Sequence, residues 1–303
     1  MAQVITLGEI LADFVPETGK SGHCGHNLKY ILRPGGAPAN VAVNLSRLGV
    51  KTAVLGRIGS DFIGDYLEDF LRQNRVVTSM ISRDSRARTG LVFVFKEKYK
   101  GTDFAFYGEP SADKFLSASD VRCGEIKNAR LLHFGSISMM APESSLATEK
   151  AVSLAQKYGL MVSFDPNVRL NLWQGRLSKA REEIRKCFAH AGIIKLSAWE
   201  LKFLFGVAPS RAALGRLFGS KAVFVTESEK GCYAYCSGNI VRVPAYKARV
   251  VDTTGAGDAF MAGVIYGIIR SGKKKLYSVK GLLEIARFAN KMGALAVSRK
   301  GAV

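Results

Sequence analysis

The stretch Asp252-Thr253-Thr254-Gly255-Ala256-Gly257-Asp258-Ala259-Phe260 leads into an apolar, helix-compatible run at 261–269, which Gly272 can end. Small residues at 255–257 let backbone N–H groups converge, and at a helix start these groups are unpaired and carry the positive end of the helix dipole. The pattern predicts a nest for a phosphate or an oxyanion. Asp258, beside the nest, could take a proton from an attacking hydroxyl. The alternative is a glycine-rich turn followed by an ordinary first-turn Asp.

Short apolar runs precede this stretch at intervals, and helical patterns lie between them. The runs are typical of buried strands, and they comprise residues 4–7, 53–57, 131–134, 161–164, 193–196 and 222–225. Helices are expected at 38–48 and 144–158, where Gly49 and Gly159 stand in the position that ends a helix. The alternation predicts an α/β fold with a mainly parallel sheet and helices on both faces. Ligands of such sheets bind beyond the carboxyl ends of the strands.

Two segments, 13–32 and 89–107, break this alternation and have an extended pattern. We expect them to form a small accessory β layer that acts as a lid over the site. The sequence contains no internal repeat, low-complexity tract or linker. Residues 1–303 are therefore predicted to form a single domain with this lid.

A second loop, Gly35-Gly36-Ala37-Pro38-Ala39-Asn40, precedes a predicted helix. Its two glycines allow the backbone to approach a ligand closely, and Pro38 can open the helix. Asn40, on the first turn, can both donate to and accept from a ligand hydroxyl. Taken alone, the segment could also be an ordinary loop before a helix.

The segment 35–40 resembles the first signature of the ribokinase-like (PfkB) carbohydrate kinase family, in the form usual for fructokinases, and the segment 252–260 resembles the second. The resemblance extends from Gly8 to Gly301. It implies a doubly wound α/β kinase fold with a β lid, and transfer of phosphate from ATP to a primary sugar hydroxyl. D-Fructose is the first choice of acceptor. Alternative acceptors are ribose, 2-keto-3-deoxygluconate, another ketose and a nucleoside. An alternative of a different class is a non-catalytic sugar or nucleotide sensor, but the retained Gly257, Asp258 and Glu200 argue against it.

The resemblance also implies sugar-binding residues. The opening Gly8-Glu9-Ile10-Leu11-Ala12-Asp13 looks like fructokinases, in which the Asp bonds paired sugar hydroxyls. The full expected sugar set is Asp13, Gly35, Gly36, Asn40, Phe104, Phe106, Ser136 and Arg169. The two phenylalanines could instead be core residues, and Arg169 could instead form a surface salt bridge. The segment 107–113 resembles another fructokinase stretch but carries Gly108 where that branch often has Arg or a polar residue.

On the nucleotide side, Gly255, Ala256 and Gly257 are expected to act with the catalytic Asp258. The residues expected at ATP are Ser197, Thr226, Ser228, Gly231, Gly255, Gly257 and Asn290. Glu200, in a motif like the family's Asn/Ser-x-x-Glu, would orient magnesium-bound water. A monovalent cation, K⁺, would take ligands from Asp252, Thr254, Ala296, Arg299 and Gly301, the last four through backbone oxygens. The implied cofactors are thus ATP, Mg²⁺ and K⁺.

Two other motifs are set aside. The Gly267-x-x-x-x-Gly272-Lys273 segment is close to a Walker A loop, but Lys274 replaces the magnesium-binding Ser or Thr and the segment falls at a helix end. His23-Cys24-Gly25-His26 could suggest a metal site, yet no second ligand cluster has suitable spacing.

The composition narrows the function classes. The net charge of +19 suits anionic ligands, but the basic residues are spread along the chain and not interleaved with aromatics, so nucleic-acid binding is not expected. Attraction of anionic ATP is sufficient to account for the positive charge.

No apolar run is long enough for a membrane span, and no signal peptide is expected. Five scattered cysteines favour a reducing cytoplasm, with Cys232 and Cys236 as buried thiols on one strand. An exposed edge strand of the lid could pair with a second copy of the chain, so a homodimer is an alternative to a monomer.

Overall fold

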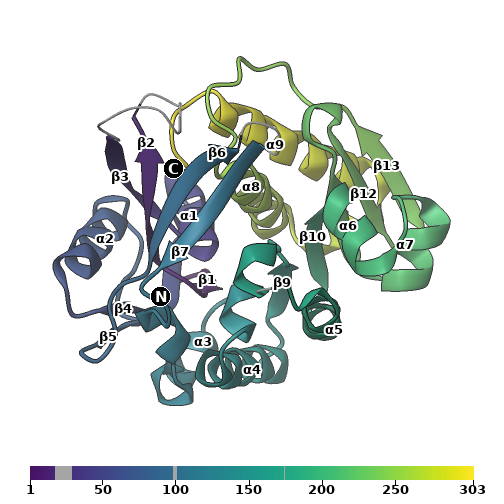
Figure 1. Cartoon of the computed structure of the whole chain (residues 1–303). Helices are drawn as coiled ribbons and strands as arrows, with labels where there is room; N and C mark the ends of the chain where they lie inside the picture. The colour runs from purple at the N-terminus through teal and green to yellow at the C-terminus, as the bar shows by residue number, and fades with distance from the viewer. Residues whose placement is uncertain (18–28, 98–100, 174) are drawn as a thin grey trace.

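Two β-sheets and the helices around them make up the protein in a computed structural model, which describes residues 1–17, 29–97, 101–173 and 175–303 (Figure 1). The larger sheet has the strand order β13-β12-β11-β10-β9-β8-β1-β4-β5. Its strands are β1 (Val4–Leu7), β4 (Thr52–Gly59), β5 (Ile81–Asp84), β8 (Leu131–Gly135), β9 (Met161–Asp165), β10 (Ile193–Ser197), β11 (Ala222–Thr226), β12 (Cys232–Cys236) and β13 (Asn239–Val243). All neighbours from β5 to β11 pair in parallel, whereas β12 and β13 are antiparallel additions.

The predicted α/β class with a mainly parallel sheet is confirmed. Each of the predicted runs lies within one strand of the larger sheet. The antiparallel pair β12–β13 was not predicted as part of the sheet, although Cys232 and Cys236 are buried on β12 as expected.

The helices of the described chain cover both faces of this sheet. They are α1 (Ala37–Arg47), α2 (Phe62–Gln73), α3 (Cys123–Ile126), α4 (Pro142–Lys157), α5 (Leu177–Cys187), α6 (Ala198–Phe205), α7 (Arg211–Phe218), α8 (Ala256–Ser271) and α9 (Val279–Val297). The expected helix at 144–158 begins two residues earlier because Pro142 can occupy the first turn without loss of a hydrogen bond. The segment 267–273, which is close to a Walker A loop in sequence, spans the end of α8, as expected.

Alternation along the strands explains why both faces are covered. Successive side chains of a strand point to opposite faces. Ile5 and Leu7 pack into one apolar cluster with side chains of α4 to α7, whereas Val4 packs into another with α1, α8 and α9. In the same way Phe224 lies on the second face while Val223 and Val225 lie on the first. A sheet buried on both sides requires such continuous apolar runs.

The smaller sheet has the order β3-β2-β6-β7 and is the expected lid layer. Its strands are β2 (Leu11–Pro16), β3 (Tyr30–Gly35), β6 (Leu91–Glu97) and β7 (Gly101–Tyr107). The rings of Phe14 and Phe93 stack with 4.7 Å between their centroids, and the Tyr107 ring contacts Phe93 edge-on. The motif at 23–26 lies outside the described residues.

The direction in which successive strands are added to the sheet reverses at β1. β4 and β5 extend the sheet on one side of β1, and β8 to β11 extend it on the other. In Figure 1 these two halves of the chain occupy opposite sides of the molecule. At such a switch point the loops after the strands diverge and leave a crevice for ligands. Within the described ranges, no helix has the length and apolar character needed to cross a membrane.

Candidate active site

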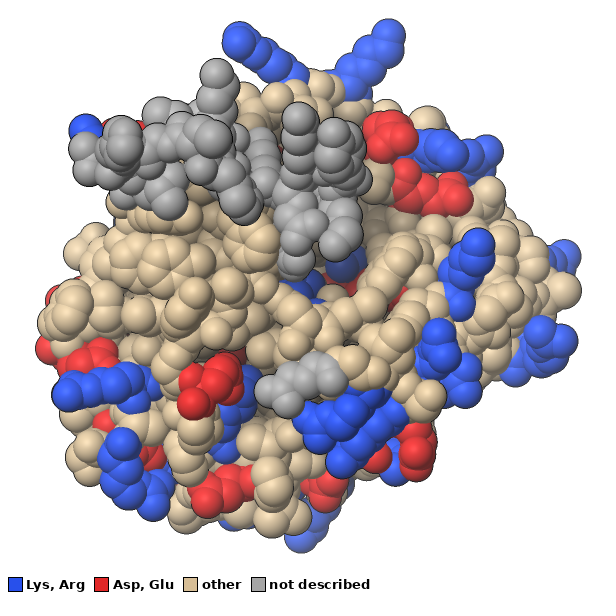
Figure 2. Space-filling model, viewed as in Figure 1, with Lys and Arg blue, Asp and Glu red and all other residues tan. Residues whose placement is uncertain are grey.

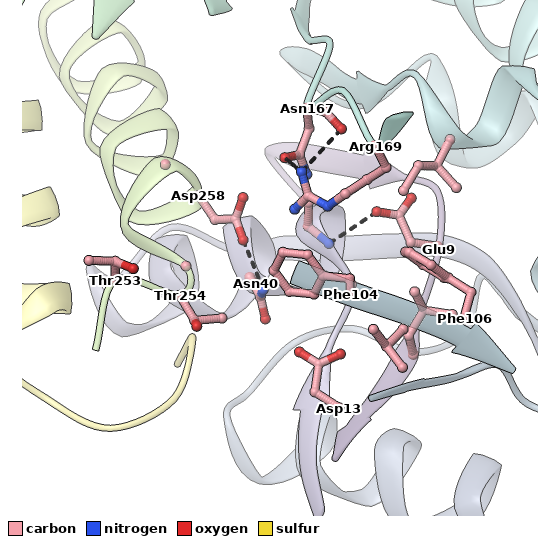
Figure 3. A pocket seen from close by; sticks show the side chains of 17 residues that line it. Glu9, Asp13, Asn40, Phe104, Phe106, Asn167, Arg169, Thr253, Thr254 and Asp258 are labelled. Carbon is pink, nitrogen blue, oxygen red and sulfur yellow. Dashed lines mark hydrogen bonds between the residues drawn. The ribbon is translucent and has the colours of Figure 1, made fainter. Parts of the chain in front are cut away.

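A cavity of about 320 Å³ lies at this switch point, between the carboxyl ends of β1, β8 and β9, the start of α8 and the lid (Figure 3). Its lining is mostly polar at the center and aromatic or aliphatic at the lid. The lining residues are Glu9, Leu11, Asp13, Gly36, Ala37, Asn40, Val92, Phe104, Phe106, Ile137, Asn167, Arg169, Thr253, Thr254, Gly255, Gly257 and Asp258.

The predicted nest lies at the N-terminus of α8. Gly255 is the N-cap residue, with φ 75°, and no side chain caps the free N–H groups of the first turn. Gly257 must remain small because a Cβ there would lie 2.9 Å from Nζ of Lys195. The N–H of Ala256 donates to the Thr253 carbonyl at 3.3 Å, whereas those of Gly257 and Asp258 have no partner among the described residues. These two donors, with the positive end of the helix dipole, suit an anion.

Asp258 is 9% exposed and faces the cavity from the first turn of α8. Its Oδ2 accepts a hydrogen bond of 2.8 Å from Nδ2 of Asn40 (Figure 3). Burial raises the pKa of Asp258 to about 6; the Asn40 hydrogen bond opposes this rise, and the Asp165 charge adds to it. A buried carboxylate with a pKa near 6 is suited to accept a proton at neutral pH. The two glycine-rich motifs, more than 200 residues apart, thus meet through one hydrogen bond.

A buried ion pair lies behind the nest. Nζ of Lys195, on β10, is 2.8 Å from Oδ2 of Asp165, at the end of β9, and both side chains are over 90% buried. Lys195 also lowers the pKa of Asp258 through its charge. Sequence reasoning did not assign a role to Lys195. The available signal was a lysine within the apolar run of a buried strand, a residue type that is almost never fully buried unless paired.

Asp13, on β2, is 8% exposed and lies on the floor of the cavity in Figure 3. Burial raises its pKa to about 7, which the charge of Arg169 opposes. Gly35, on the neighbouring strand, does not line the cavity; it lies behind Asp13, and a Cβ there would come within 2.5 Å of the Asp13 carboxyl group. Gly35 therefore leaves space for the aspartate and does not itself face a ligand.

Arg169 and Phe104 both line the cavity and are in direct cation–π contact. The Arg169 guanidinium lies 4.9 Å from the Phe104 ring centroid, and its Nη1 donates to Oδ1 of Asn167 at 2.6 Å. Phe106 also lines the cavity. Both expected phenylalanines thus lie at the cavity instead of in a core cluster. Arg169 also lines the cavity, and it forms no salt bridge with a described residue.

Besides Gly35, two further residues expected at the site, Ser136 and Ala256, do not line the cavity. The Ser136 side chain is 2% exposed, and its hydroxyl donates to the carbonyl of Pro166. The next residue, Ile137, lines the cavity in its place. Ala256 is also absent from the lining, and its N–H donates to the Thr253 carbonyl at 3.3 Å. The expected contact of Ser136 with a sugar therefore has no support in the geometry.

Four of the residues expected at the nucleotide, Ser197, Thr226, Ser228 and Gly231, lie at or just after the ends of β10 and β11, whereas Gly255 and Gly257 belong to the nest and Asn290 to α9. Ser197 caps α6 and forms a capping box with Glu200, whose Oε2 accepts from N and Oγ of Ser197 at 2.7 and 2.9 Å. Oε1 of Glu200 accepts one bond of 2.8 Å from Val168 N. A carboxylate oxygen has two lone pairs, so Oε1 retains capacity for one donor, as a magnesium-bound water would be.

The turn after β11 contains the other expected nucleotide contacts, at Thr226, Ser228 and Gly231. Ser228 has φ 50°, a conformation that favours glycine. Asn290, on α9, is 7% exposed and donates to the carbonyls of Val243 and Pro244 at 3.1 and 3.0 Å. Its amide donors thus hold the loop after β13 against α9.

The residues expected at a monovalent cation partly come together. Oδ1 of Asp252 accepts from N and Oγ1 of Thr254 at 3.0 and 2.8 Å, and its Oδ2 accepts from N of Gly301 at 3.0 Å. The loop before α8 and the segment after α9 are thereby joined around one carboxylate. Ala296 and Arg299 lie at the end of α9, where the N–H of Arg299 bonds to the carbonyl of Ala296.

Comparisons with known proteins agree with this geometry. The pfkB family carbohydrate kinase profile matches residues 1–303. The chain is 38% identical to fructokinase-1 of Zea mays over 303 residues, which covers 99% of this chain and 93% of that one. Its structure is similar to an ATP-bound fructokinase of Xylella fastidiosa (TM-score 0.89, 30% identity, 100% and 94% coverage). It is similar too to a double mutant of Vibrio cholerae O395 fructokinase with bound fructose, ADP and potassium ion (TM-score 0.87, 31% identity, 100% and 94% coverage). The chain therefore belongs to the pfkB family of carbohydrate kinases.

Proposed function

We propose that the protein is an ATP-dependent fructokinase that converts D-fructose to fructose 6-phosphate. The observation that carries the proposal is the position of Asp258, which faces the polar cavity at the edge of the N–H nest and is bonded to Asn40. The relatives named above are fructokinases, and one of the structures contains fructose and ADP. The cavity of about 320 Å³ suits a monosaccharide.

The chemistry follows from these groups. Asp258 takes the proton of the primary hydroxyl, whose oxygen attacks the γ-phosphorus of ATP in line while the bond to the β-phosphate bridging oxygen breaks and ADP leaves. The N–H groups of the first turn of α8 hydrogen-bond the transferring group, and Arg169 can add a positive charge. Mg²⁺, when bound through water near Glu200, supplies neutralisation of the phosphate charges.

The lid would limit hydrolysis of ATP. Phe104 and Phe106 on β7 and Val92 on β6 contribute apolar side chains to the cavity wall. A closed apolar cover excludes water and so favours transfer to the sugar over transfer to water. We assign the sugar to the lid side of Asp258 and ATP to the side of β10 and β11.

The test is coupled ADP release with a panel of acceptors: D-fructose, D-ribose, 2-keto-3-deoxygluconate, another ketose and a nucleoside. The expected result is the highest kcat/KM with D-fructose. A higher value with another acceptor would replace fructose within the same class. No turnover with any acceptor, together with measurable binding of sugar or ATP, would instead identify a non-catalytic sensor.

The same proposal includes a monovalent cation and an oligomeric state. Asp252, Thr254 and Gly301 lie together near the nest, so we expect turnover to rise when K⁺ replaces a larger organic cation. β3 and β7 form the edges of the lid sheet, and edge strands can pair with another chain; a homodimer through the lid would appear in light scattering as twice the chain mass. We propose a single domain in the cytoplasm, with free thiols at Cys123, Cys187, Cys232 and Cys236.

A further inference from the structure

The ion pair between Lys195 and Asp165 lies against the nest and has no part in the reaction described above. Nζ of Lys195 and Oδ2 of Asp165 are 2.8 Å apart, and the two side chains are 8% and 6% exposed. A Cβ at Gly257 would lie 2.9 Å from the same Nζ. The ammonium group therefore lies directly against the first turn of α8, beside the residue that precedes Asp258.

The fold alone does not explain a charged pair at this position. The neighbours of Lys195 along β10, namely Ile193, Ile194 and Leu196, are buried and apolar. Burying two charges costs free energy, and well-packed apolar side chains in their place are often equally stable or more stable. A buried pair that is retained beside the reacting groups is therefore a candidate for a role in the reaction.

Charged groups surround Asp258 on several elements. Those that act on it most strongly are Asp165 at the end of β9, Lys195 on β10 and Arg169 in the loop after β9. The other carboxyl groups nearby are Glu9 and Asp13 in the cavity lining, Asp252 before α8 and Glu200 on α6. Carboxyl groups thus outnumber the two cations, and Lys195 is the cation that is buried behind the nest.

The two partners of the pair act on Asp258 in opposite directions. Burial raises the pKa of Asp258 to about 6; the charge of Asp165 adds to this rise, and the charge of Lys195 opposes it. Burial lowers the pKa of Lys195, but the charges of Asp165, Glu200 and Asp258 outweigh burial and hold this pKa above its ordinary value. Lys195 therefore stays charged at every pH at which Asp258 titrates.

We propose that Lys195 and Asp165 are positioning residues for phosphate transfer: the charge of Lys195 keeps Asp258 ionised at neutral pH, and Asp165 limits this effect so that Asp258 remains basic enough to take the hydroxyl proton. The inference rests on the proposed function and deepens it, since it assigns what sets the pH range of the base. A base must be both largely ionised and sufficiently basic at the working pH, and the pair adjusts these two requirements against each other.

The test measures kcat against pH in two single variants. In Lys195→Met the acidic limb should move about 1 pH unit higher, because a positive charge near Asp258 has been removed. In Asp165→Asn it should move about 1 pH unit lower, because the positive charge of Lys195 is no longer balanced. Asp165→Asn carries the test by itself if Lys195→Met does not fold, since the amide oxygen can still accept from Nζ of Lys195.

The double variant Lys195→Met/Asp165→Asn removes both charges. Because the two effects oppose each other, its acidic limb should lie between those of the single variants, close to that of the unaltered protein. Limbs that move in the same direction in both single variants, or that do not move in either, would overturn the proposal and leave the pair with a structural role only.

Asp113→Asn is the matched control. Asp113 forms a similar buried pair with Lys114, with 3.1 Å between Oδ2 and Nζ and with side chains 5% and 10% exposed. Neither residue lines the cavity. Asp113→Asn should therefore lower the melting temperature, as the loss of a buried partner does, and leave the acidic limb of kcat unchanged. An equal displacement of the limb in Asp113→Asn and Asp165→Asn would contradict the proposal.

A second measurement needs no turnover. Carbon-13 NMR of the aspartate carboxyl groups follows the titration of Asp258, whose signal is identified by its loss in Asp258→Asn. The midpoint should lie near pH 6 in the unaltered protein and should be lower in Asp165→Asn. An identical midpoint in the two proteins would refute the inference. Absence of turnover with every acceptor would instead refute the proposed function while the NMR midpoints still differ, so the two failures are distinguishable.

Discussion

At the residue scale, the environment of Asp258 determines what the carboxylate can do. In water an aspartate is a weak base at neutral pH, whereas burial in this cavity raises its pKa to about 6. Asn40 donates to Oδ2 and leaves Oδ1 for the hydroxyl of an acceptor. The buried Lys195–Asp165 pair places a positive charge close to Gly257 in the nest.

Replacing Asp258 with Asn should lower kcat by about 10²–10⁴, the usual contribution of a general base. KM for D-fructose and ATP should change little, because the amide keeps the shape of the side chain and can still pair with Asn40. Steady-state kinetics of the purified variant test this. Near-normal turnover would mean that another group takes the proton.

The pH dependence of turnover should have an acidic limb near pH 6. Only the ionised form of Asp258 can accept a proton, so kcat should fall as the pH drops through about 6. The pKa of Asp13 is raised to about 7, mainly by burial, so kcat/KM for the sugar should begin to fall at a higher pH than kcat. A kcat that stays constant from pH 8 to pH 5 would exclude Asp258 as the base.

The same raised pKa predicts a cost in stability. A carboxyl group whose pKa is higher in the folded than in the unfolded chain favours folding when protonated, so this contribution is present below about pH 4 and is lost as the pH rises through about 6. At pH 8 the charged Asp258 is therefore destabilising. Asp258→Asn should raise the melting temperature at pH 8 by about 2–4 °C and have a smaller effect at pH 5. Thermal scans at both pH values test this, and a lower melting temperature at pH 8 would contradict it.

At the element scale, the site depends on close contacts between strands and helix starts. β2 and β3 pair so that Leu11 lies opposite Gly35, and Asp13 then turns its carboxyl group toward the position where a side chain at 35 would be. The N–H of Ala37 at the start of α1 donates to Glu9, two residues after the end of β1, since Gly36 has no side chain to accept it. Short elements thus fix the distances between the cavity's polar groups.

Gly35→Ala should raise KM for D-fructose by about 10-fold or more and leave KM for ATP unchanged. The new methyl group would lie 2.5 Å from the Asp13 carboxyl group and force it to move, and the loss of a charged hydrogen bond has about this effect. Gly124→Ala is the control, because a Cβ there meets no atom within 4 Å. Equal KM values for both variants and the unaltered protein would show that Asp13 does not bind the sugar.

At the scale of the whole molecule, the net charge of +19 acts over longer distances than any single contact. Lys and Arg side chains are distributed over the face in Figure 2, with Asp and Glu among them. Such a field attracts an anionic nucleotide and has little effect on a neutral sugar. Salt shortens the range of the field, from about 10 Å at 0.1 M to about 3 Å at 1 M.

We therefore expect kcat/KM for ATP to fall several-fold when tetramethylammonium chloride is raised from about 0.05 to 0.5 M at constant K⁺. The value of kcat/KM for D-fructose at saturating ATP is the internal control, since it should stay nearly constant. Parallel changes for both substrates would show that salt acts on the enzyme's conformation and not on encounter with ATP.

The sequence by itself determined the class of fold and the elements near the chemistry. The runs at 4–7, 131–134 and 193–196 are local signals, and the glycine-rich start of α8 is a local signal as well, because a helix start requires particular residues within a few positions. A strand at Cys232 and Cys236 was expected, but β13 and the antiparallel pairing of both strands with the sheet were not predicted, since the short runs CYAYC and NIVRV do not reveal which strand they pair with. Pairing is decided by contacts between distant segments.

Only the tertiary structure decided which side chains share the cavity. Ser136 follows a strand on the correct side of the sheet, yet its hydroxyl is occupied by the Pro166 carbonyl, while Glu9 and Lys195, without an assigned role in the sequence, are buried next to the reacting groups. Spacing along the chain does not encode the direction of a side chain after a loop, which depends on packing against segments up to 200 residues away. The sequence thus predicted the glycine-rich motif that contains Asp258, and the fold established the charges that surround it.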